Sequence, residues 1–284
     1  MKNGNLKPGE KKSLTICAID SRNPGLAARA IEKTMTNVPH EAAVLFTDKT
    51  TETKARIRII KEIKGIEDYN RFVINNLHNE IETTHALIVQ WDGYAISNNW
   101  RSEFFEYDYI GAIWEFINDQ HRVGNGGFSL RSKKLLKAIS EIGRNETPAE
   151  NEDYYICRSK RGELEEQYGI VFASEYIAGM FSYELKKRTE ETLGFHGLWN
   201  IGQHEPEDEI LDLIENLMPE QVLDARLILL MIRCIHNQKY TAFRMIYDKI
   251  RRAGGQDLIE DVLVNKIRLS KGLVKSINKA AGCK

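Results

Sequence analysis

The chain has 284 residues, of which 42% are hydrophobic and 29% are charged, so it can bury a core and is not expected to be disordered. Forty basic residues against 41 acidic ones leave no overall field that would favour nucleic acid or an anionic membrane as a partner. No apolar run approaches the roughly 20 residues needed to span a bilayer, no signal peptide is recognised and the four cysteines form no CxxC pair, so a cytoplasmic protein is expected.

Short apolar runs alternate with helical patterns in the first 95 residues, which predicts a mainly parallel sheet flanked by helices. The expected strands are Leu14 to Ile19, Ala43 to Thr47, Ile57 to Ile63 and His85 to Gln90. Asn23 and Pro24 predict a helix start after the first strand, and residues 69–77 have helical spacing. Asp20, Asp48 and Asp92 each follow the end of a strand, where open sheets of this kind bind ligands.

A different pattern follows between residues 107 and 130, with the strand-like pieces YDYIGAIW and GFSL separated by a polar segment and a cluster of glycines. Ser132 is expected to cap a helix that ends near Ile142, and a further helix is expected to start near Asn151. From Glu205 onward only helical stripes remain, and Pro206 lies in an acidic stretch that suits a boundary. The sequence therefore predicts an α/β domain over residues 1–204 and an all-helical region over residues 205–284.

Four segments have residue types that suit chemistry. In VQWDG, residues 89–93, a strand delivers Asp92 to its exposed end beside a glycine; a strand-end turn is the plain alternative. In VGNGGFSLRS, residues 123–132, glycines let the backbone approach a ligand, but the segment lacks GxGxxG spacing and a Walker lysine, and a hairpin turn would also explain it.

The other two segments lie later in the chain. NEDYYICRSKRG, residues 151–162, begins a helix with Glu152 and Asp153, where the helix dipole favours an ionised carboxylate that can accept a proton. The alternative is that these two acidic residues are only the usual acidic residues of a helix N-terminus, with no role in catalysis. LGFHGLWN, residues 193–200, offers His196 to a divalent metal and Trp199 to a sugar ring, although a lone loop histidine is often incidental.

The order of these segments resembles that of metal-dependent inverting glycosyltransferases with the GT-A fold. GGFSLRSKKLL followed by NEDYYICRSKRG is similar to the pattern of animal β-galactosyltransferases. Residues 14–200 also resemble an uncharacterised bacterial family of glycosyltransferase-like proteins that has QxDG, YDYIGAxW, GNGGFSLRS, an ED pair and GFHG in this order. The helical tail lies outside both resemblances. An α/β, Rossmann-like domain that binds a nucleotide sugar is therefore expected.

The resemblance also implies roles for individual residues. Asp92 would contact the metal and the donor diphosphate, His196 would be a further metal ligand and Asp153 would be the general base. The donor sugar would be lined by Gly126, Gly127 and Phe128, with Glu152 on its hydroxyls. The other residues expected in donor or acceptor binding are Asp20, Arg22, Asp48, Trp91, Trp114 and Trp199. Gln90 departs from the family's DxD motif at its first acidic position, which weakens the expectation of a tightly held metal.

The implied activity is transfer of a hexose from a nucleotide sugar, with UDP expected by analogy, to a glycan acceptor, as in polysaccharide biosynthesis, with the help of Mn²⁺ or Mg²⁺. Two other classes stay open: a non-catalytic module that binds carbohydrate or nucleotide sugars, and a metal-dependent nuclease or nucleotidyltransferase built on Asp20, Asp48 and Asp92. The balanced charge counts against nucleic acid. Peripheral docking on a membrane and oligomerisation through the helical tail are further expectations.

Overall fold

The structure, a computed structural model, describes residues 11–145, 148–266, 268 and 279. The chain divides into two compact units, residues 1–196 and residues 197–284, which are described separately below. The domain limits expected from the sequence, residues 1–204 and 205–284, stay predictions.

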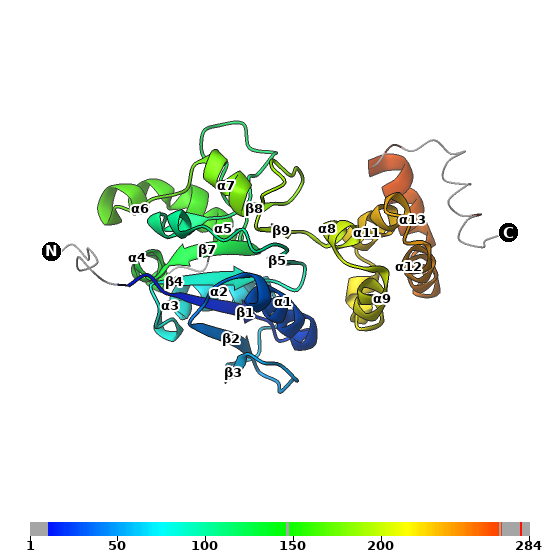
Figure 1. Cartoon of the computed structure of the whole chain (residues 1–284), viewed down its shortest axis with the longest axis horizontal. Coiled ribbons are helices and arrows are strands. Elements are labelled where there is room, and N and C mark those ends of the chain that lie inside the picture. The colour runs from blue at the N-terminus through cyan, green and yellow to red at the C-terminus, as the bar shows by residue number, and fades with distance from the viewer. Residues whose placement is uncertain (1–10, 146–147, 267, 269–278, 280–284) are drawn as a thin grey trace. The chain divides into compact units, whose positions relative to one another are not determined.

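The first unit is built on a mainly parallel sheet (Figure 1), which in the described residues has six strands in the order β3-β2-β1-β4-β7-β6. Its strands are β1 (Leu14–Ile19), β2 (Ala42–Thr47), β3 (Arg56–Ile59), β4 (His85–Val89), β6 (Tyr109–Ile110) and β7 (Phe128–Ser132). The pairs among β1 to β4 are parallel, whereas β7 is antiparallel to both β4 and β6. This topology confirms the α/β class expected from the sequence.

The strand β3 is shorter than the expected Ile57 to Ile63. The chain leaves the sheet after Ile60 donates to Thr47 O, and the Ile63 N–H donates instead to Ser21 Oγ. The side chains of Ile60 and Ile63 then pack against the core beside the sheet, so their apolar character is used in packing and not in strand pairing.

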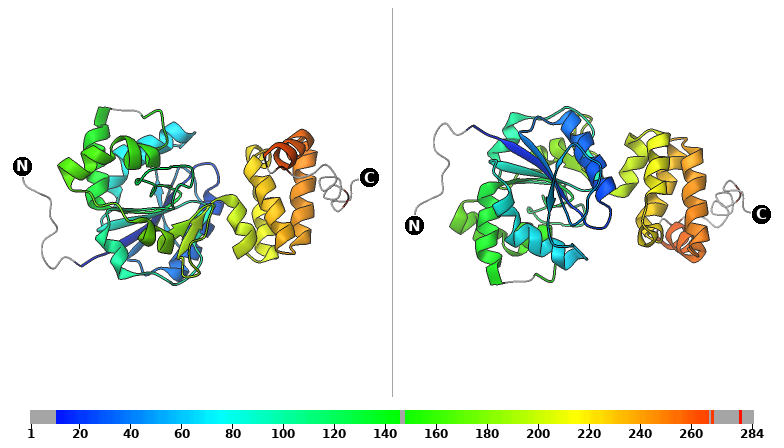
Figure 2. Two further views of the ribbon diagram at one scale, coloured as in Figure 1. Left: turned by 90° about the horizontal axis from the view of Figure 1, so that it is seen from above. Right: turned by 90° about the horizontal axis from the view of Figure 1, so that it is seen from below.

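Helices cover both faces of this sheet (Figure 2). Those of the first unit are α1 (Pro24–Asn37), α2 (Ile66–Asn75), α3 (Leu77–Glu80), α4 (Lys133–Ile142), α5 (Glu152–Tyr154), α6 (Arg161–Tyr168) and α7 (Glu175–Phe181), with the 3-10 turns η1 (Ser102–Glu106) and η2 (Gly143–Asn145) and the π-helix η3 (Tyr155–Ser159). Asn23 and Ser132 cap α1 and α4 as expected, because their side chains accept from Leu26 N and Leu135 N. The helix expected over residues 69–77 is α2, followed by α3.

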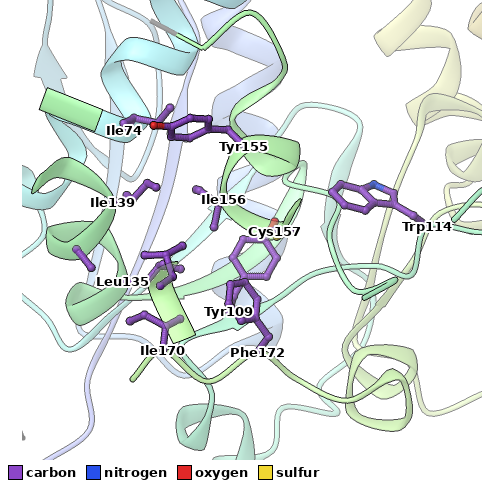
Figure 3. Packing of buried hydrophobic residues seen from close by; sticks show 12 residues of the cluster. Ile74, Tyr109, Trp114, Leu135, Ile139, Tyr155, Ile156, Cys157, Ile170 and Phe172 are labelled. Carbon is purple, nitrogen blue, oxygen red and sulfur yellow. The ribbon is translucent and has the colours of Figure 1, made fainter. Parts of the chain in front are cut away.

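Apolar side chains fill the space between α4, η3 and α6 (Figure 3). This cluster includes Leu135 and Ile139 of α4, Ile156 and Cys157 of η3, and Phe172 beyond α6. It fixes the segment that follows α5 against the edge of the sheet. The start of α5, which contains Glu152 and Asp153, is therefore held in position by the packing of the segment that follows it.

A second, smaller sheet has the order β5-β9-β8 in the described residues. It consists of β5 (Gly93–Ala95), β8 (Ser182–Tyr183) and β9 (Gly194–His196). Since β5 follows β4 almost at once, this sheet begins where the fourth strand of the main sheet ends.

The described part of the second unit is helical, as expected from the apolar stripes. Its helices are α8 (Leu198–His204), α9 (Glu207–Glu215), α10 (Pro219–Val222), α11 (Ala225–His236), α12 (Tyr240–Arg252), α13 (Gln256–Asp261) and the π-helix η4 (Val262–Lys266). Most of the expected helical tail after Lys266, including Cys283, lies outside the described residues. No helix in the described ranges has both the length and the apolar composition needed to cross a membrane.

Helix α8 belongs to this second unit by its packing. Leu198 and Ile201 are buried, and α8 approaches α11 so closely that a Cβ on Gly202 would lie 2.7 Å from the Cβ of Arg233. The Lys239 ammonium donates to Gly202 O at 2.7 Å and so closes the end of the helix.

We predict that a fragment of residues 197–284 folds to a helical unit with a cooperative thermal transition, and that a fragment of residues 205–284 unfolds at a much lower temperature. Loss of α8 uncovers apolar surface, and each buried Leu or Ile contributes about 1.5–3 kcal/mol. The midpoint should fall by at least about 15 °C, because a domain of this size loses about 4–8 °C per kcal/mol. Circular dichroism at 222 nm against temperature measures both fragments; equal melting curves would show that α8 is not part of the unit.

Candidate active site

Strand pairing brings three distant segments of the sequence together. Because β7 is antiparallel to β4, Phe128 at its start pairs with Val89 at the end of β4, which places Gly127 beside the segment that carries Asp92. In the small sheet, Gly93 pairs with His196. Gly127 is so close to the imidazole that an added Cβ would lie 2.1 Å from His196 Cδ2. Only glycine fits at this position without displacing the ring.

The centre of the site is the pair Asp92 and His196. His196 Nε2 lies 3.7 Å from Asp92 Oδ1, and the side chains are 16% and 3% exposed. On the other side of the ring, Nδ1 lies 3.2 Å from Glu184 Oε1 and 3.1 Å from Asn125 Nδ2. A carboxylate that accepts from Nδ1–H fixes the ring so that Nε2 faces Asp92, which is how histidines are oriented toward metals.

The electrostatic surroundings of His196 favour its charged form. Burial by itself would lower the pKa of His196, but Asp92, the hydrogen bond and charge of Glu184, and Asp153 together raise the pKa above its ordinary value. The same residues that favour a positive imidazole would favour a cation at this place.

A loop of glycines connects this pair to Asp153. The Gly126 N–H donates to Asp153 Oδ2 at 2.8 Å, while Asp153 Oδ1 accepts from the N–H of Tyr154 at 2.8 Å. Asn125, just before, has a left-handed φ of 49°, which asparagine tolerates better than most residues. The half-buried carboxylate of Asp153 is thus held in place by two backbone donors.

Glu152 is paired with Arg131 inside the protein. Its two carboxylate oxygens accept from Arg131 Nη1 at 2.6 Å and Nη2 at 3.0 Å, and the side chains are 4% and 0% exposed. Burial raises the pKa of the Glu152 carboxyl, and the charge of Arg131 opposes this rise. Both oxygens of Glu152 therefore already bind Arg131. The expected contact of Glu152 with sugar hydroxyls stays a prediction.

The ends of β1 and β2 contribute the other acidic residues. Asp20 Oδ1 accepts from the N–H groups of Arg22 and Asn23 at 2.7 and 2.8 Å, so it shapes the turn into α1. Burial, with a smaller contribution from Asp92, raises the pKa of Asp20 despite these two donors, which indicates that Asp20 and Asp92 lie on the same rim. Arg22 is exposed and Asp48 is half-buried at the end of β2.

The aromatic candidates differ in exposure. Trp91 is half-buried, and Trp114 is only 5% exposed. The Phe128 ring is fully buried and stacks on Phe181, so this residue can line a ligand only through its backbone. Trp199 lies on α8 in the second unit, and its expected contact with a sugar stays a prediction.

Three residues of the site were not expected from the sequence: Glu184, Asn125 and Arg131. Asn125 stands inside the glycine-rich segment, which was itself a signal. Arg131 is in the same segment, but nothing in the local sequence shows that its charge is buried. Glu184 follows β8 in a stretch without any motif, so only the structure places it beside His196.

A family model described as a protein of unknown function (DUF5672) matches residues 54–196. The chain belongs to the DUF5672 family. The matched part of this DUF5672 protein includes Asp92, Asp153, Glu184 and His196, whereas Asp20, Asp48 and Trp199 lie outside it. A comparison with curated proteins finds no match.

Solved structures similar to this DUF5672 protein include several glycosyltransferases. One involved in glycosylation of the major capsid of PBCV-1 is 14% identical over 65% of this chain and 92% of its own, with a TM-score of 0.44. The apo form of GlyE from Streptococcus pneumoniae is 11% identical over 66% and 54% (TM-score 0.41). The mannosyltransferase PcManGT from Pyrobaculum calidifontis, in complex with GDP-Man and Mn²⁺, is 10% identical over 97% and 87% (TM-score 0.41).

The buried pair gives a direct test of what supports this site in the DUF5672 protein. Arg131→Met leaves the Glu152 carboxylate buried without its partner, and we expect the free energy of unfolding to fall by about 3–5 kcal/mol. The double variant Arg131→Met/Glu152→Leu should recover most of that loss, because an apolar pair carries no uncompensated charge. Urea unfolding followed by fluorescence measures both. If the double variant is as unstable as the single one, the loss comes from packing and not from charge.

Proposed function

We propose that this protein is an inverting glycosyltransferase that uses a divalent metal and a nucleotide sugar. The observation that supports it most is the convergence of Asp92, His196 and Asp153 on one glycine loop. Gly127 lies against His196, and Gly126 donates to Asp153. A pair suited to a metal and a separately held carboxylate therefore share one short stretch of backbone, as a reaction between a diphosphate donor and a hydroxyl acceptor needs.

The residues present fit a divalent cation that is shared with a ligand. Metal bonds to carboxylate oxygen and imidazole nitrogen are about 2.0–2.2 Å long, so one ion can contact both Asp92 Oδ1 and His196 Nε2, which are 3.7 Å apart. In the part of the chain that the structure describes, no three His, Cys, Asp or Glu groups gather into a complete metal site. The diphosphate of the donor would supply the remaining ligands. When bound, the ion would neutralise charge on the leaving diphosphate.

Asp153 is the proposed general base. The acceptor oxygen attacks the anomeric carbon, its proton passes to Asp153, and the bond from that carbon to the nucleotide diphosphate breaks on the opposite face. Because there is one displacement, the configuration of the sugar is inverted. The two backbone donors fix the orientation of the Asp153 carboxylate. Glu152 has a positioning role, because its pairing with Arg131 holds the start of α5 in place.

The donor nucleotide is assigned to the rim formed by Asp20 and Asp92, at the carboxyl ends of β1 and β4, with Arg22, Asp48 and Trp91 as further candidate contacts. A nuclease would need several carboxylates around an ion, and the described ranges contain no such cluster. UDP as the nucleotide and a hexose as the transferred sugar remain part of the proposal.

Metal and nucleotide binding are predicted to depend on each other. UDP or GDP should bind the wild-type protein at least 10-fold more tightly with Mn²⁺ than after EDTA treatment, because two protein ligands hold a hard cation weakly without the diphosphate. Asp92→Asn should remove this response, while the exposed Asp208→Asn on α9 should keep it. Isothermal titration calorimetry measures each affinity. An Asp92→Asn variant with an unchanged metal response would exclude Asp92 as a ligand.

Replacement of the base should separate binding from turnover. Asp153→Asn should bind the nucleotide nearly as tightly as the wild type but transfer the sugar about 10²–10⁴-fold more slowly, since a positioned general base contributes about that factor. One backbone donor loses its acceptor, so a stability loss of about 1 kcal/mol is also expected. Calorimetry and release of nucleotide from the nucleotide sugar give the two readouts. Turnover close to wild type would assign the base elsewhere.

A further inference from the structure

Three aromatic rings stand in a row beside the candidate active site. The ring centroid of Trp114 lies 5.9 Å from that of Tyr154 and 6.0 Å from that of Phe116, with interplanar angles of 35° and 37°. Trp114 in the middle is 5% exposed, but Tyr154 and Phe116 are 38% and 64% exposed. Exposed aromatic side chains that are grouped in this way usually mark a binding surface.

Trp114 and Phe116 belong to one short turn, which the N–H of Ile117 closes by donating to Trp114 O at 3.3 Å. Glu115, between them in sequence, pairs with Arg122 and Arg188. Ile113 lines a cavity of about 420 Å³ together with Tyr176 of α7, and none of the three rings of the row lines this cavity. The aromatic row is therefore a separate surface, with its own neighbours.

The glycine loop places the row next to the reacting groups. A Cβ on Gly124 would lie 2.3 Å from the Trp114 ring, while Gly126 touches Asp153 and Gly127 touches His196. Three residues of chain span at most about 11 Å. The order along the loop is thus the histidine of the proposed metal pair, then the proposed base, then the aromatic row, and Tyr154 directly follows Asp153 in sequence.

Polar groups edge the row. Arg158, one turn after Tyr154, donates to both carboxylate oxygens of Asp119 at 2.8 and 2.7 Å, and its Nη1 also donates to His121 O at 3.0 Å. Asp119 is exposed, so its oxygens can accept from ligand hydroxyls as well. Flat apolar rings with hydrogen-bonding groups at their edge suit a pyranose, which has an apolar C–H face and a rim of hydroxyls.

We propose that the exposed rings of Tyr154 and Phe116, with the buried Trp114 packed against both, form an acceptor platform, on which a pyranose ring of the glycan acceptor stacks with one hydroxyl directed at Asp153. This inference rests on the proposed glycosyltransferase function. The platform lies on the side of Asp153 away from His196 along the loop, whereas the nucleotide is assigned to the rim at Asp20 and Asp92. A sugar is therefore the occupant that the arrangement favours over a nucleobase.

The platform can be tested by saturation-transfer NMR on the full chain with UDP and Mn²⁺ present. The probes are lactose, cellobiose, maltose and N-acetyllactosamine. We expect saturation of ring C–H protons in at least one probe, and at least a 5-fold weaker affinity for it in Phe116→Ala and Tyr154→Ala. Tyr154→Phe, which keeps the ring, should bind as the wild type does. Tyr176→Ala, a 75% exposed tyrosine on α7, is the matched control and should change nothing.

The outcomes separate the platform from the function on which it rests. Unchanged sugar affinity in both alanine variants, or no binding of any probe to the wild type, would overturn the platform. Weaker UDP binding with unchanged sugar binding would assign the rings to the nucleobase and also overturn it. Failure of the wild type to bind any nucleotide would instead contradict the glycosyltransferase proposal, while a loss of sugar binding in the two variants would still place the sugar on these rings.

Discussion

The buried ion pair between Arg131 and Glu152 determines the position of everything that follows it in the site. Both charges are excluded from water, so neither side chain can leave the other without a large cost in free energy. Arg131 belongs to β7, in the interior of the sheet, and Glu152 is the first residue of α5. The pair therefore ties the start of α5 to the sheet, and Asp153 and Tyr154, the next two residues, take their places from it.

The antiparallel strand β7 is the second constraint. A sheet that was parallel throughout would send the start of β7 to the opposite edge from the end of β4. Because β7 runs the other way, its glycine-rich beginning lies beside Asp92, and the short pairing of Gly93 with His196 completes the group. Residues more than 100 positions apart thus meet through strand register and not through a continuous motif.

Signals that act over a few residues were sufficient to predict much of this fold from the sequence. The strand β1, the caps Asn23 and Ser132, and a helix start after Asn151 follow from local apolar runs and capping chemistry. The partners of side chains did not follow, because they depend on which segments meet in space. Arg131 gave no sign that it is buried, and Glu184 gave no sign that it reaches His196. The roles of Asp92, Asp153 and His196 came from the order of motifs, and they remain proposals.

The contacts of the loop from Gly124 to Gly127 also bear on how such a protein can diversify. At three of its four positions any larger side chain would collide with Trp114, Glu152 or His196. Substitutions at these three glycines are therefore expected to be rejected both in natural evolution and in directed evolution. New specificity has to arise in the surrounding side chains. Libraries that keep the loop and randomise exposed neighbours such as Phe116 should retain far more folded members than libraries that randomise the loop.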